Sequence, residues 1–324
     1  MRFDLNKFWQ QKNIFNYLLL PIAGIFFLLT RFNVWFANPQ KVTAKVICVG
    51  NITVGGAGKT PLALAIGEML KKQGYKVAFI SRGFKGSLSN HRKVVKVDSL
   101  LHTAQEVGDE PLLLANTAPT YICINRYLAA SHATTDGAQV IIMDDGLQNY
   151  SLFKDIKILV LDDFFYFGNS FLLPAGPLRA AKFEALKDAD FICINQNKAA
   201  PEWDLELGKP IFFITTKVTN AHQVRNKQFV IMSGIANPKK LLNTLNELNV
   251  TIVEKFFFPD HHYFSESELQ RIIGVAKKHR CKIITTSKDF TKIPASLRKY
   301  FIVLSIKKTL PKLFSQKLLN RLFL

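Results

Sequence analysis

The sequence predicts an α/β protein of two lobes with mostly parallel sheets. Short, continuously apolar runs recur along the chain, and helix-length segments lie between several of them. Continuous apolar runs are typical of parallel strands that helices cover on both faces. The chain has 324 residues, of which 48% are hydrophobic and 21% charged. This length suits about two domains, and the composition excludes disordered, collagen-like and coiled-coil proteins.

The expected elements follow one another along the chain. Helices are expected over residues 60–73 and 266–279, among others. The polar segment 215–228 lacks a strong period, so we expect a first lobe over residues 41–215 and a smaller second lobe over 216–324. Strands are expected at 45–50, 76–81, 94–97, 121–125, 140–143, 156–161, 191–194, 211–214, 229–232, 283–286 and 301–304.

Residues 1–40 form a hydrophobic segment that we expect to associate with a membrane. Residues 13–30 carry no charge, and basic and aromatic residues flank them, as suits a membrane interface. Spanning a bilayer takes about 20 apolar residues, and this run is short and contains Asn16, Pro21 and Gly24. An interfacial helix hairpin is favoured over a spanning helix or a helix packed on the protein's own core. No clean cleavage site for a signal peptide follows.

The charge balance favours an anionic partner. Lys and Arg total 43 and Asp and Glu total 24, a formal charge of +19. Such an excess of positive charge is compatible with binding to nucleic acid, to acidic lipid or to a phosphorylated substrate, and it does not distinguish these three partners. The four cysteines include no Cys-x-x-Cys pair, which favours buried reduced thiols over a zinc site or a disulfide scaffold.

A phosphate-binding loop is the strongest chemical signal. The apolar run ending near Gly50 leads into Gly-Gly-Ala-Gly-Lys-Thr, and a helix-forming stretch follows. Glycines let backbone N–H groups approach phosphate oxygens, Lys59 would reach the β- and γ-phosphates, and Thr60 would hold Mg²⁺. Thr53 stands where the common pattern has glycine. The expected nucleotide-binding residues are Thr53, Val54, Gly55, Gly56, Ala57, Gly58, Lys59 and Thr60.

Two carboxylates follow another predicted strand. Asp144 and Asp145 come directly after the apolar residues 140–143. A phosphate loop needs a metal-binding acid at the end of a neighbouring strand, and Mg²⁺ prefers oxygen ligands. We therefore expect Asp144 and Asp145 to share the metal with Thr60, although Asp-Asp-Gly alone is often only a turn.

Seven motifs follow one another over roughly residues 45–290: Val54-Gly-Gly-Ala-Gly-Lys-Thr-Pro61, Ser81-Arg-Gly-Phe84, Val107-Gly-Asp-Glu-Pro111, Asp144-Asp-Gly-Leu-Gln148, Leu173-Pro-Ala-Gly-Pro-Leu-Arg179, Phe258-Pro-Asp-His-His262 and Thr285-Thr-Ser-Lys-Asp289. In combination, they resemble the tetraacyldisaccharide 4′-kinase family of lipid A biosynthesis. The resemblance implies a two-lobed P-loop kinase-like α/β/α sandwich with a hydrophobic amino-terminal helix. It implies Mg²⁺-dependent transfer of the γ-phosphate of ATP to the 4′-hydroxyl of a tetraacylated glucosamine disaccharide 1-phosphate, giving lipid IV-A. It places the enzyme, peripheral or monotopic, at the cytoplasmic face of the bacterial inner membrane.

The resemblance also implies residue roles. Asp109 falls at the position of the family's catalytic aspartate; read without the family, it is a helix N-cap. His261 would orient or tune Asp109, with His262 as the alternative and Asp260 acting on either histidine. Lys59 joins the catalytic set. Contacts to substrate or phosphate are expected from Arg82, Gln148 and Arg179.

Four positions depart from the family pattern. Ala180 stands where Glu is usual, Asn149 where His often follows, Phe84 where Tyr is common and Ser287 where Glu is frequent. None of these changes touches the phosphate loop, the paired aspartates or Asp109, so we expect an active enzyme.

Two other functions compete with the lipid kinase. A membrane-recruited P-loop ATPase switch explains the loop and the amino terminus, but leaves Asp109 and His261 without a role. A nucleic-acid-binding protein would explain the charge, but no helix-turn-helix, RRM or zinc pattern is present, so no nucleic acid is expected. The expected partners are the acylated disaccharide 1-phosphate and an anionic membrane surface, and the oligomeric state is left open.

Overall fold

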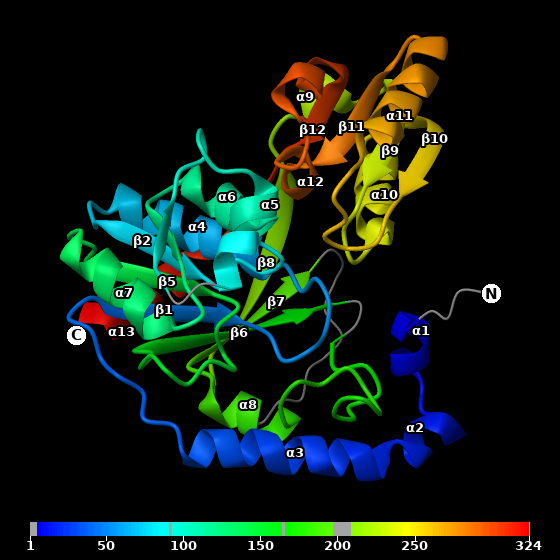
Figure 1. Cartoon of the computed structure of the whole chain (residues 1–324). Coiled ribbons are helices and arrows are strands. Elements are labelled where there is room, and N and C mark those ends of the chain that lie inside the picture. The colour runs from blue at the N-terminus through cyan, green and yellow to red at the C-terminus, as the bar shows by residue number, and fades with distance from the viewer. Residues whose placement is uncertain (1–4, 91–92, 164–165, 197–208, 324) are drawn as a thin grey trace. The chain divides into compact units, whose positions relative to one another are not determined.

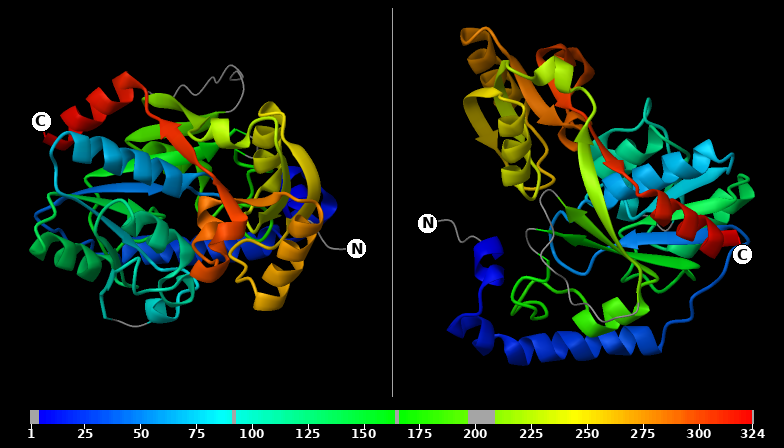
Figure 2. Two further views of the ribbon diagram at one scale, coloured as in Figure 1. Left: turned by 90° about the horizontal axis from the view of Figure 1, so that it is seen from above. Right: turned by 180° about the vertical axis from the view of Figure 1, so that it is seen from behind.

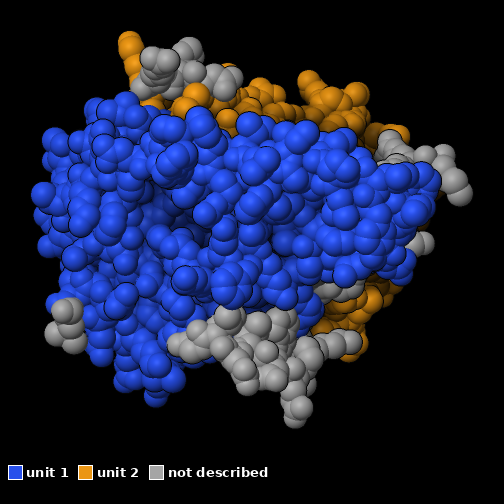
Figure 3. Space-filling view, turned by 90° about the horizontal axis from the view of Figure 1, so that it is seen from below, with its two compact units in different colours: residues 1–81, 125–216, 308–324 blue, residues 82–124, 217–307 orange. Residues whose placement is uncertain are grey.

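The computed structural model describes residues 5–90, 93–163, 166–196 and 209–323, so the first four residues of the expected amino-terminal segment lie outside it. The chain divides into two compact units (Figure 3). Unit 1 comprises residues 1–81, 125–216 and 308–324, and unit 2 comprises residues 82–124 and 217–307.

Unit 1 is built on a parallel sheet with the strand order β8-β7-β6-β1-β5-β2. In the centre, Ile47 of β1 lies between Ile142 of β5 and Ile156 of β6. The central strands are buried along almost their whole length, which is why they read as continuous apolar runs. The strands are β1 (Lys45–Gly50), β2 (Val77–Ser81), β5 (Val140–Asp144), β6 (Ile156–Asp162), β7 (Phe191–Gln196) and β8 (Ile211–Val218).

Helices cover both faces of this sheet (Figures 1 and 2). Helix α4 (Lys59–Lys72) lies so close to one face that a Cβ atom on Gly67 would come within 2.5 Å of the Phe79 ring. Helix α8 (Lys182–Asp188) packs on the other face through Leu186. Helix α7 (Arg126–Thr135) contacts β2, and Phe314 of α13 (Lys312–Phe323) packs edge-on against the ring of Phe212.

The amino terminus forms α1 (Leu5–Gln10), α2 (Ile14–Leu18) and α3 (Leu20–Trp35), and α3 lies beside α8 (Figure 1). Three hydrogen bonds of the described residues attach the first two helices to the segment 169–175: Trp9 Nε1 donates to the carbonyl of Pro174 at 3.1 Å, Asn16 Nδ2 to that of Ala175 at 2.8 Å, and the Asn169 N–H to that of Trp9 at 2.7 Å. The 16 residues of α3 reach about 24 Å, whereas the hydrocarbon core of a bilayer is about 30 Å thick. Within the described ranges, no helix is long and apolar enough to cross a membrane.

Unit 2 contains a second parallel sheet, with the order β10-β9-β11-β12. Alternate residues of β9 point to opposite faces: Val230 packs with α11 (Glu266–Lys278), and Phe229 with α10 (Pro238–Glu247). These two helices therefore cover opposite faces of the sheet. The strands are β9 (Gln228–Ser233), β10 (Thr251–Phe257), β11 (Lys282–Thr286) and β12 (Phe301–Leu304).

Residues 82–124 add a small antiparallel pair and two short helices to unit 2. Strand β3 (Val95–Val97) pairs with β4 (Thr120–Ile122), and an apolar cluster joins them to α5 (Ala104–Val107) and α6 (Asp109–Ala115). The hydroxyl of Tyr263 donates to the Ala104 carbonyl at 3.1 Å, which ties this segment to the loop after β10. The remaining elements are η1 (Ser87–Asn90), α9 (Ala221–Val224), α12 (Ser287–Phe290), η2 (Ala295–Tyr300) and β13 (Ile306–Thr309).

The strands lie where the apolar runs indicated, but the division into units differs from the one expected. Residues 82–124 belong with 217–307, and residues 308–324 belong with the amino-terminal part, whereas the sequence boundary at 215/216 separated them. Apolar periodicity shows that a segment is buried, not against which sheet it packs. Strand β10 was not expected, because Glu254 and Lys255 interrupt its apolar pattern at the edge of the sheet.

Candidate functional site

The glycine-rich loop in unit 1 connects β1 to α4. Gly55 and Gly58 have φ values of +118° and +78°, which favour glycine, and Gly58 is the N-cap of α4. A Cβ atom on Gly58 would lie 2.7 Å from Nδ2 of Asn195. The loop therefore presents backbone N–H groups at the positive end of the α4 dipole, which is the arrangement that binds phosphate.

Buried amide side chains hold the loop in this shape. Asn51, at the end of β1, donates to the carbonyl of Thr53 at 2.9 Å and to its hydroxyl at 3.1 Å. Gln148 Nε2 donates to the Asn51 carbonyl at 2.9 Å. On the far side, the amide of Asn195, at the end of β7, donates to the Ala57 carbonyl. The loop is thus fixed from three neighbouring segments before any ligand is considered.

A hydroxyl and a carboxylate suited to Mg²⁺ lie beside the loop. Thr60 Oγ1, in the first turn of α4, donates to Asp144 Oδ2 at 2.8 Å, and Asp144 is buried at the carboxyl end of β5. Mg²⁺ binds oxygen ligands at about 2.0–2.1 Å in an octahedron, so adjacent ligands are about 2.9 Å apart. The spacing and chemistry of these two oxygens fit that ion.

Asp145 pairs with two cations. Its φ of +50° turns the carboxylate away from the β5 direction, towards Lys59 at 3.5 Å and Arg179 at 3.0 Å. Arg179 also donates to the carbonyl of Asn51 at 2.9 Å, and Lys59 to its Oδ1 atom at 3.0 Å. Burial disfavours the charged carboxylate of Asp145, but Lys59 and Arg179 outweigh this and hold its pKa below the ordinary value.

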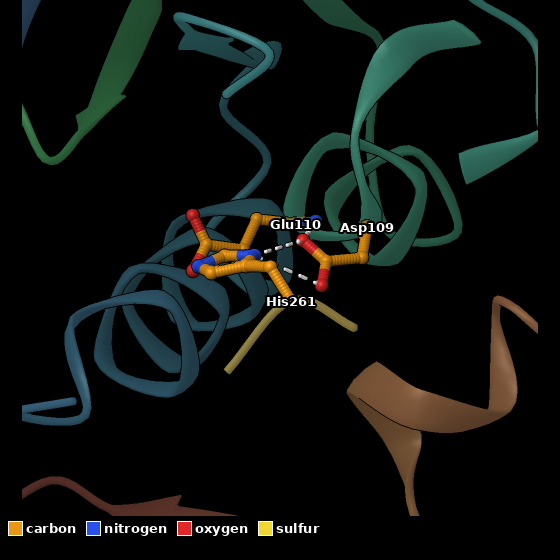
Figure 4. Close-up of side chains that lie close together, drawn as sticks. All are labelled: Asp109, Glu110 and His261. Atoms are coloured by element: carbon orange, nitrogen blue, oxygen red, sulfur yellow. Dashed lines mark hydrogen bonds and ion pairs between the residues drawn. The ribbon is translucent and has the colours of Figure 1, made fainter. Parts of the chain in front are cut away.

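A second cluster lies within unit 2, around Asp109. Asp109 is the first residue of α6 and is almost completely buried, and its Oδ1 atom accepts the Glu110 N–H at 2.9 Å. His261, in the loop after β10, directs Nδ1 at both carboxylate oxygens, at 3.0 and 3.1 Å (Figure 4). The N-cap of α6 is Gly108, not Asp109.

Lys288 occupies the centre of the same cluster. One oxygen or nitrogen atom of each of Asp109, Glu110 and His261 lies within 4.8 Å of the others, a spacing that could hold a metal ion. The ammonium of Lys288, however, lies 3.2 Å from Glu110 and 3.1 Å from Nε2 of His261. This protonated side chain already supplies the positive charge that such a cluster requires.

A second lysine, Lys292, pairs with Asp109. Lys292 is only 1% exposed and pairs with Asp289 at 2.8 Å and with Asp109 at 3.8 Å. Burial raises the pKa of Asp109, but the hydrogen bond from His261 and the charges of Lys288 and Lys292 more than compensate, so the pKa lies below the ordinary value. Asp109 is therefore a buried carboxylate that stays ionised at neutral pH.

The structure thus places the expected residues in two groups. Unit 1 brings the loop together with Asp144, Asp145, Gln148 and Arg179, and unit 2 brings Asp109 together with His261 and Asp260. Arg82 is exposed and belongs to unit 2. His262 pairs with Glu268 at 3.0 Å, so the alternative that gave His262 the place beside Asp109 is not supported.

Several residues of these groups were given no role from the sequence, among them Asn51, Asn195, Lys288 and Lys292. Asn51 directly follows β1, and Asn195 lies at the end of β7, so the rule that ligands bind at the carboxyl ends of parallel strands could have found both. Lys288 lies in the quoted motif at 285–289 without an assigned role. No local pattern identifies Lys292, because its partners come from distant segments.

Comparisons with known proteins agree in one family. The family model described as "Tetraacyldisaccharide-1-P 4′-kinase" matches residues 15–323. The chain is 41% identical to a tetraacyldisaccharide 4′-kinase of Parvibaculum lavamentivorans, covering 85% of this chain and 81% of that protein. It is 35% identical to the one of Rhodospirillum rubrum, covering 98% and 97%.

A solved structure shows the same fold. The crystal structure of an LpxK from Aquifex aeolicus in complex with ATP has a TM-score of 0.78, at 24% identity, and covers 96% of this chain and 100% of that one. The expected α/β fold with mostly parallel sheets is confirmed. The chain belongs to the tetraacyldisaccharide 4′-kinase family.

Proposed function

We propose that this protein transfers the γ-phosphoryl group of ATP to the 4′-hydroxyl of a tetraacylated glucosamine disaccharide 1-phosphate, giving lipid IV-A. Family membership supports the reaction. The observation that carries the proposal is the buried carboxylate of Asp109, which accepts a hydrogen bond from His261 at 3.0 Å and is kept ionised by neighbouring cations. A carboxylate of this kind can accept the proton of an alcohol nucleophile.

In this proposal unit 1 binds the nucleotide. Lys59 would exchange its contact with Asp145 for the β- and γ-phosphates, and Thr60 and Asp144 would hold Mg²⁺. The metal, when bound, neutralises charge on the phosphate oxygens. Asp145 is a further metal ligand only if it releases Lys59 or Arg179. The phosphates contact the loop residues Thr53, Val54, Gly55, Gly56, Ala57, Gly58, Lys59 and Thr60.

Unit 2 supplies the base. As the sugar oxygen forms its bond to the γ-phosphorus, the bond from that phosphorus to the bridging oxygen breaks and ADP leaves. Asp109 takes the hydroxyl proton, and His261 keeps the carboxylate correctly oriented. We assign Arg179, Gln148 and Arg82 to phosphate or substrate contacts, with Arg179 supported by its position beside the phosphate loop.

The amino-terminal helices suit a membrane surface. Large apolar side chains of α2 and α3 are more than half exposed, among them Phe15, Leu28, Phe32 and Trp35. Buried hydrogen bonds at Trp9 and Asn16 hold these helices to the rest of unit 1. We propose that they dock, as a peripheral or monotopic element, on the anionic cytoplasmic face of the inner membrane, where the acylated acceptor lies.

A kinase assay tests the proposal. The purified full chain is incubated with ATP, Mg²⁺ and the acylated disaccharide 1-phosphate, and phosphorus NMR and mass spectrometry locate the new phosphate. We expect a phosphomonoester at the 4′ position, and an Asp109→Asn variant that binds ATP normally but loses at least about 1,000-fold in kcat, within the range of general-base effects. ATP hydrolysis at full rate without the acceptor would instead identify an ATPase switch.

A further inference from the structure

We propose that Lys288 is a positioning residue that fixes His261 as the neutral tautomer with its proton on Nδ1. In this state His261 donates to Asp109 and cannot compete with the sugar hydroxyl as a proton source. The inference rests on the proposed function and deepens it, because it explains how Asp109 is kept free to accept the proton of the sugar hydroxyl. Lys288 acts through His261 and needs no contact with the substrate.

The hydrogen-bond geometry determines the tautomer. Lys288 Nζ lies 3.1 Å from Nε2 of His261, and a protonated amine has donors only. Nε2 must therefore accept, so that the single ring proton of a neutral imidazole is on Nδ1. Nδ1 faces both carboxylate oxygens of Asp109, at 3.0 and 3.1 Å, where a donor is required.

A proton on Nε2 of His261 would have no acceptor at hydrogen-bond distance. A proton on Nε2 would point at the ammonium of Lys288, and the nearest carboxylate oxygen, Asp260 Oδ2, lies 3.6 Å away, beyond ordinary hydrogen-bond distance. An imidazolium would add a second positive charge 3.1 Å from the first. The Nε2–H tautomer is therefore less stable than the Nδ1–H tautomer, and Lys288 opposes a second ring proton, while Lys288 is charged.

Lys288 has enough negative partners to stay charged. Its ammonium lies 3.2 Å from Glu110, 3.2 Å from Asp260 and 3.9 Å from Asp109. Burial lowers the pKa of Lys288, but Glu110, Asp109 and Asp260 outweigh it and move the pKa above the ordinary value. Lys292 and its partner Asp289 are further charged groups beside Asp109.

A purely structural role would have different consequences. Lys288 joins Glu110 of α6 to Asp260 of the loop after β10, so its loss could simply loosen these segments. Loosening changes stability and kcat together, but it does not move a ring proton or shift a pH profile. The discriminating measurements are therefore the protonation of His261 and the pH dependence of kcat.

The experiment compares Lys288→Met with Lys288→Arg in the full chain labelled with ¹⁵N-histidine, with His261→Gln used to assign the ring signals. In the wild type we expect a protonated Nδ1 and an unprotonated Nε2 at pH 7.5. In Lys288→Met we expect the imidazole to gain its second proton at higher pH. The acidic limb of the kcat profile then moves up by about one pH unit, so kcat falls by up to about tenfold at pH values below this limb, stays the same on the alkaline side, and KM for ATP is unchanged.

Two controls separate this effect from others. Lys288→Arg keeps a donor-only cation and should restore the Nδ1–H tautomer and most of the pH profile. Lys278→Met, which removes an exposed lysine from α11, should leave both unchanged. A wild-type spectrum with the proton on Nε2, or an unshifted profile in Lys288→Met, would overturn the inference. If the wild type shows the expected tautomer but has no kinase activity, the proposed function is refuted while the inference about Lys288 stands.

Discussion

Gly58→Ala tests whether the shape of the phosphate loop is what binds the nucleotide. At a φ of +78°, a side chain costs about 1–2 kcal/mol relative to glycine. In addition, the new Cβ atom would lie 2.7 Å from Nδ2 of Asn195. Displacing this amide breaks its hydrogen bond to Ala57, which is worth about 1 kcal/mol. The loop is thus expected to lose about 2–3 kcal/mol.

This cost should appear mainly in ATP affinity. The variant loop can relax when it is empty, but it must recover its shape to surround the phosphates. A penalty of about 2–3 kcal/mol corresponds to a Kd about 30- to 150-fold weaker, measured by calorimetry or by competition with a fluorescent ATP analogue. Urea unfolding of the same variant measures how much of the cost stays in the folded state.

Gly74→Ala is the matched control. Gly74 also has a positive φ, +88°, but no atom lies within 4 Å of its added Cβ. It should lose about 1–2 kcal/mol of unfolding free energy and keep its ATP affinity. Adding Asn195→Ala to Gly58→Ala should cost little more, because Gly58→Ala has already displaced the Asn195 amide and broken its hydrogen bond to Ala57. Normal ATP affinity in Gly58→Ala, with stability equal to that of Gly74→Ala, would refute the reasoning.

Two further predictions concern the buried lysine and the amino-terminal helices. Lys292→Met leaves Asp289 buried without its counter-charge, so we expect the free energy of unfolding, measured in urea, to fall by about 3–5 kcal/mol. The loss should be smaller in the double variant that also carries Asp289→Asn. A loss below about 1 kcal/mol in Lys292→Met would contradict a stabilising ion pair. Changing Leu28 and Phe32 of α3 to Ser removes two apolar side chains, each of which contributes about 1.5–3 kcal/mol when it inserts into a membrane. The affinity for vesicles that contain acidic lipid should therefore fall at least about 100-fold. The control variant Leu128→Ser on α7 should bind the vesicles as the wild type does. If the wild type, the α3 double variant and Leu128→Ser all sediment equally with the vesicles, α3 is not the docking element.

The elements and the phosphate loop could be predicted because their signals are local. A strand buried on both faces must be apolar along its length, and the φ values of Gly55 and Gly58 call for glycine whatever surrounds them. The parallel pairing of β1 with β5 then brings Asp144 to Thr60, since both lie at the carboxyl edge of one sheet. The order of motifs along the chain was therefore sufficient to predict that Thr60 and Asp144 lie together.

The partners of the charged side chains could not be predicted in this way. Asp145 has the same local signal as Asp144, yet it pairs with Lys59 and Arg179 while Asp144 accepts from Thr60. The difference arises from the backbone turn at Asp145, whose φ is +50°. One residue along the chain is enough to direct two identical carboxylates to different chemistry.

The amino-acid sequence by itself determined the α/β class, the phosphate loop and the family motifs, because backbone preference and apolar periodicity act over a few residues. Only the tertiary structure decided which segments form each unit and which cations surround Asp109. His261 is 152 residues from Asp109, and Lys288 is 178 residues from Glu110. Electrostatic interactions depend on distance in space and on burial, and folding sets both for residues that no local pattern connects.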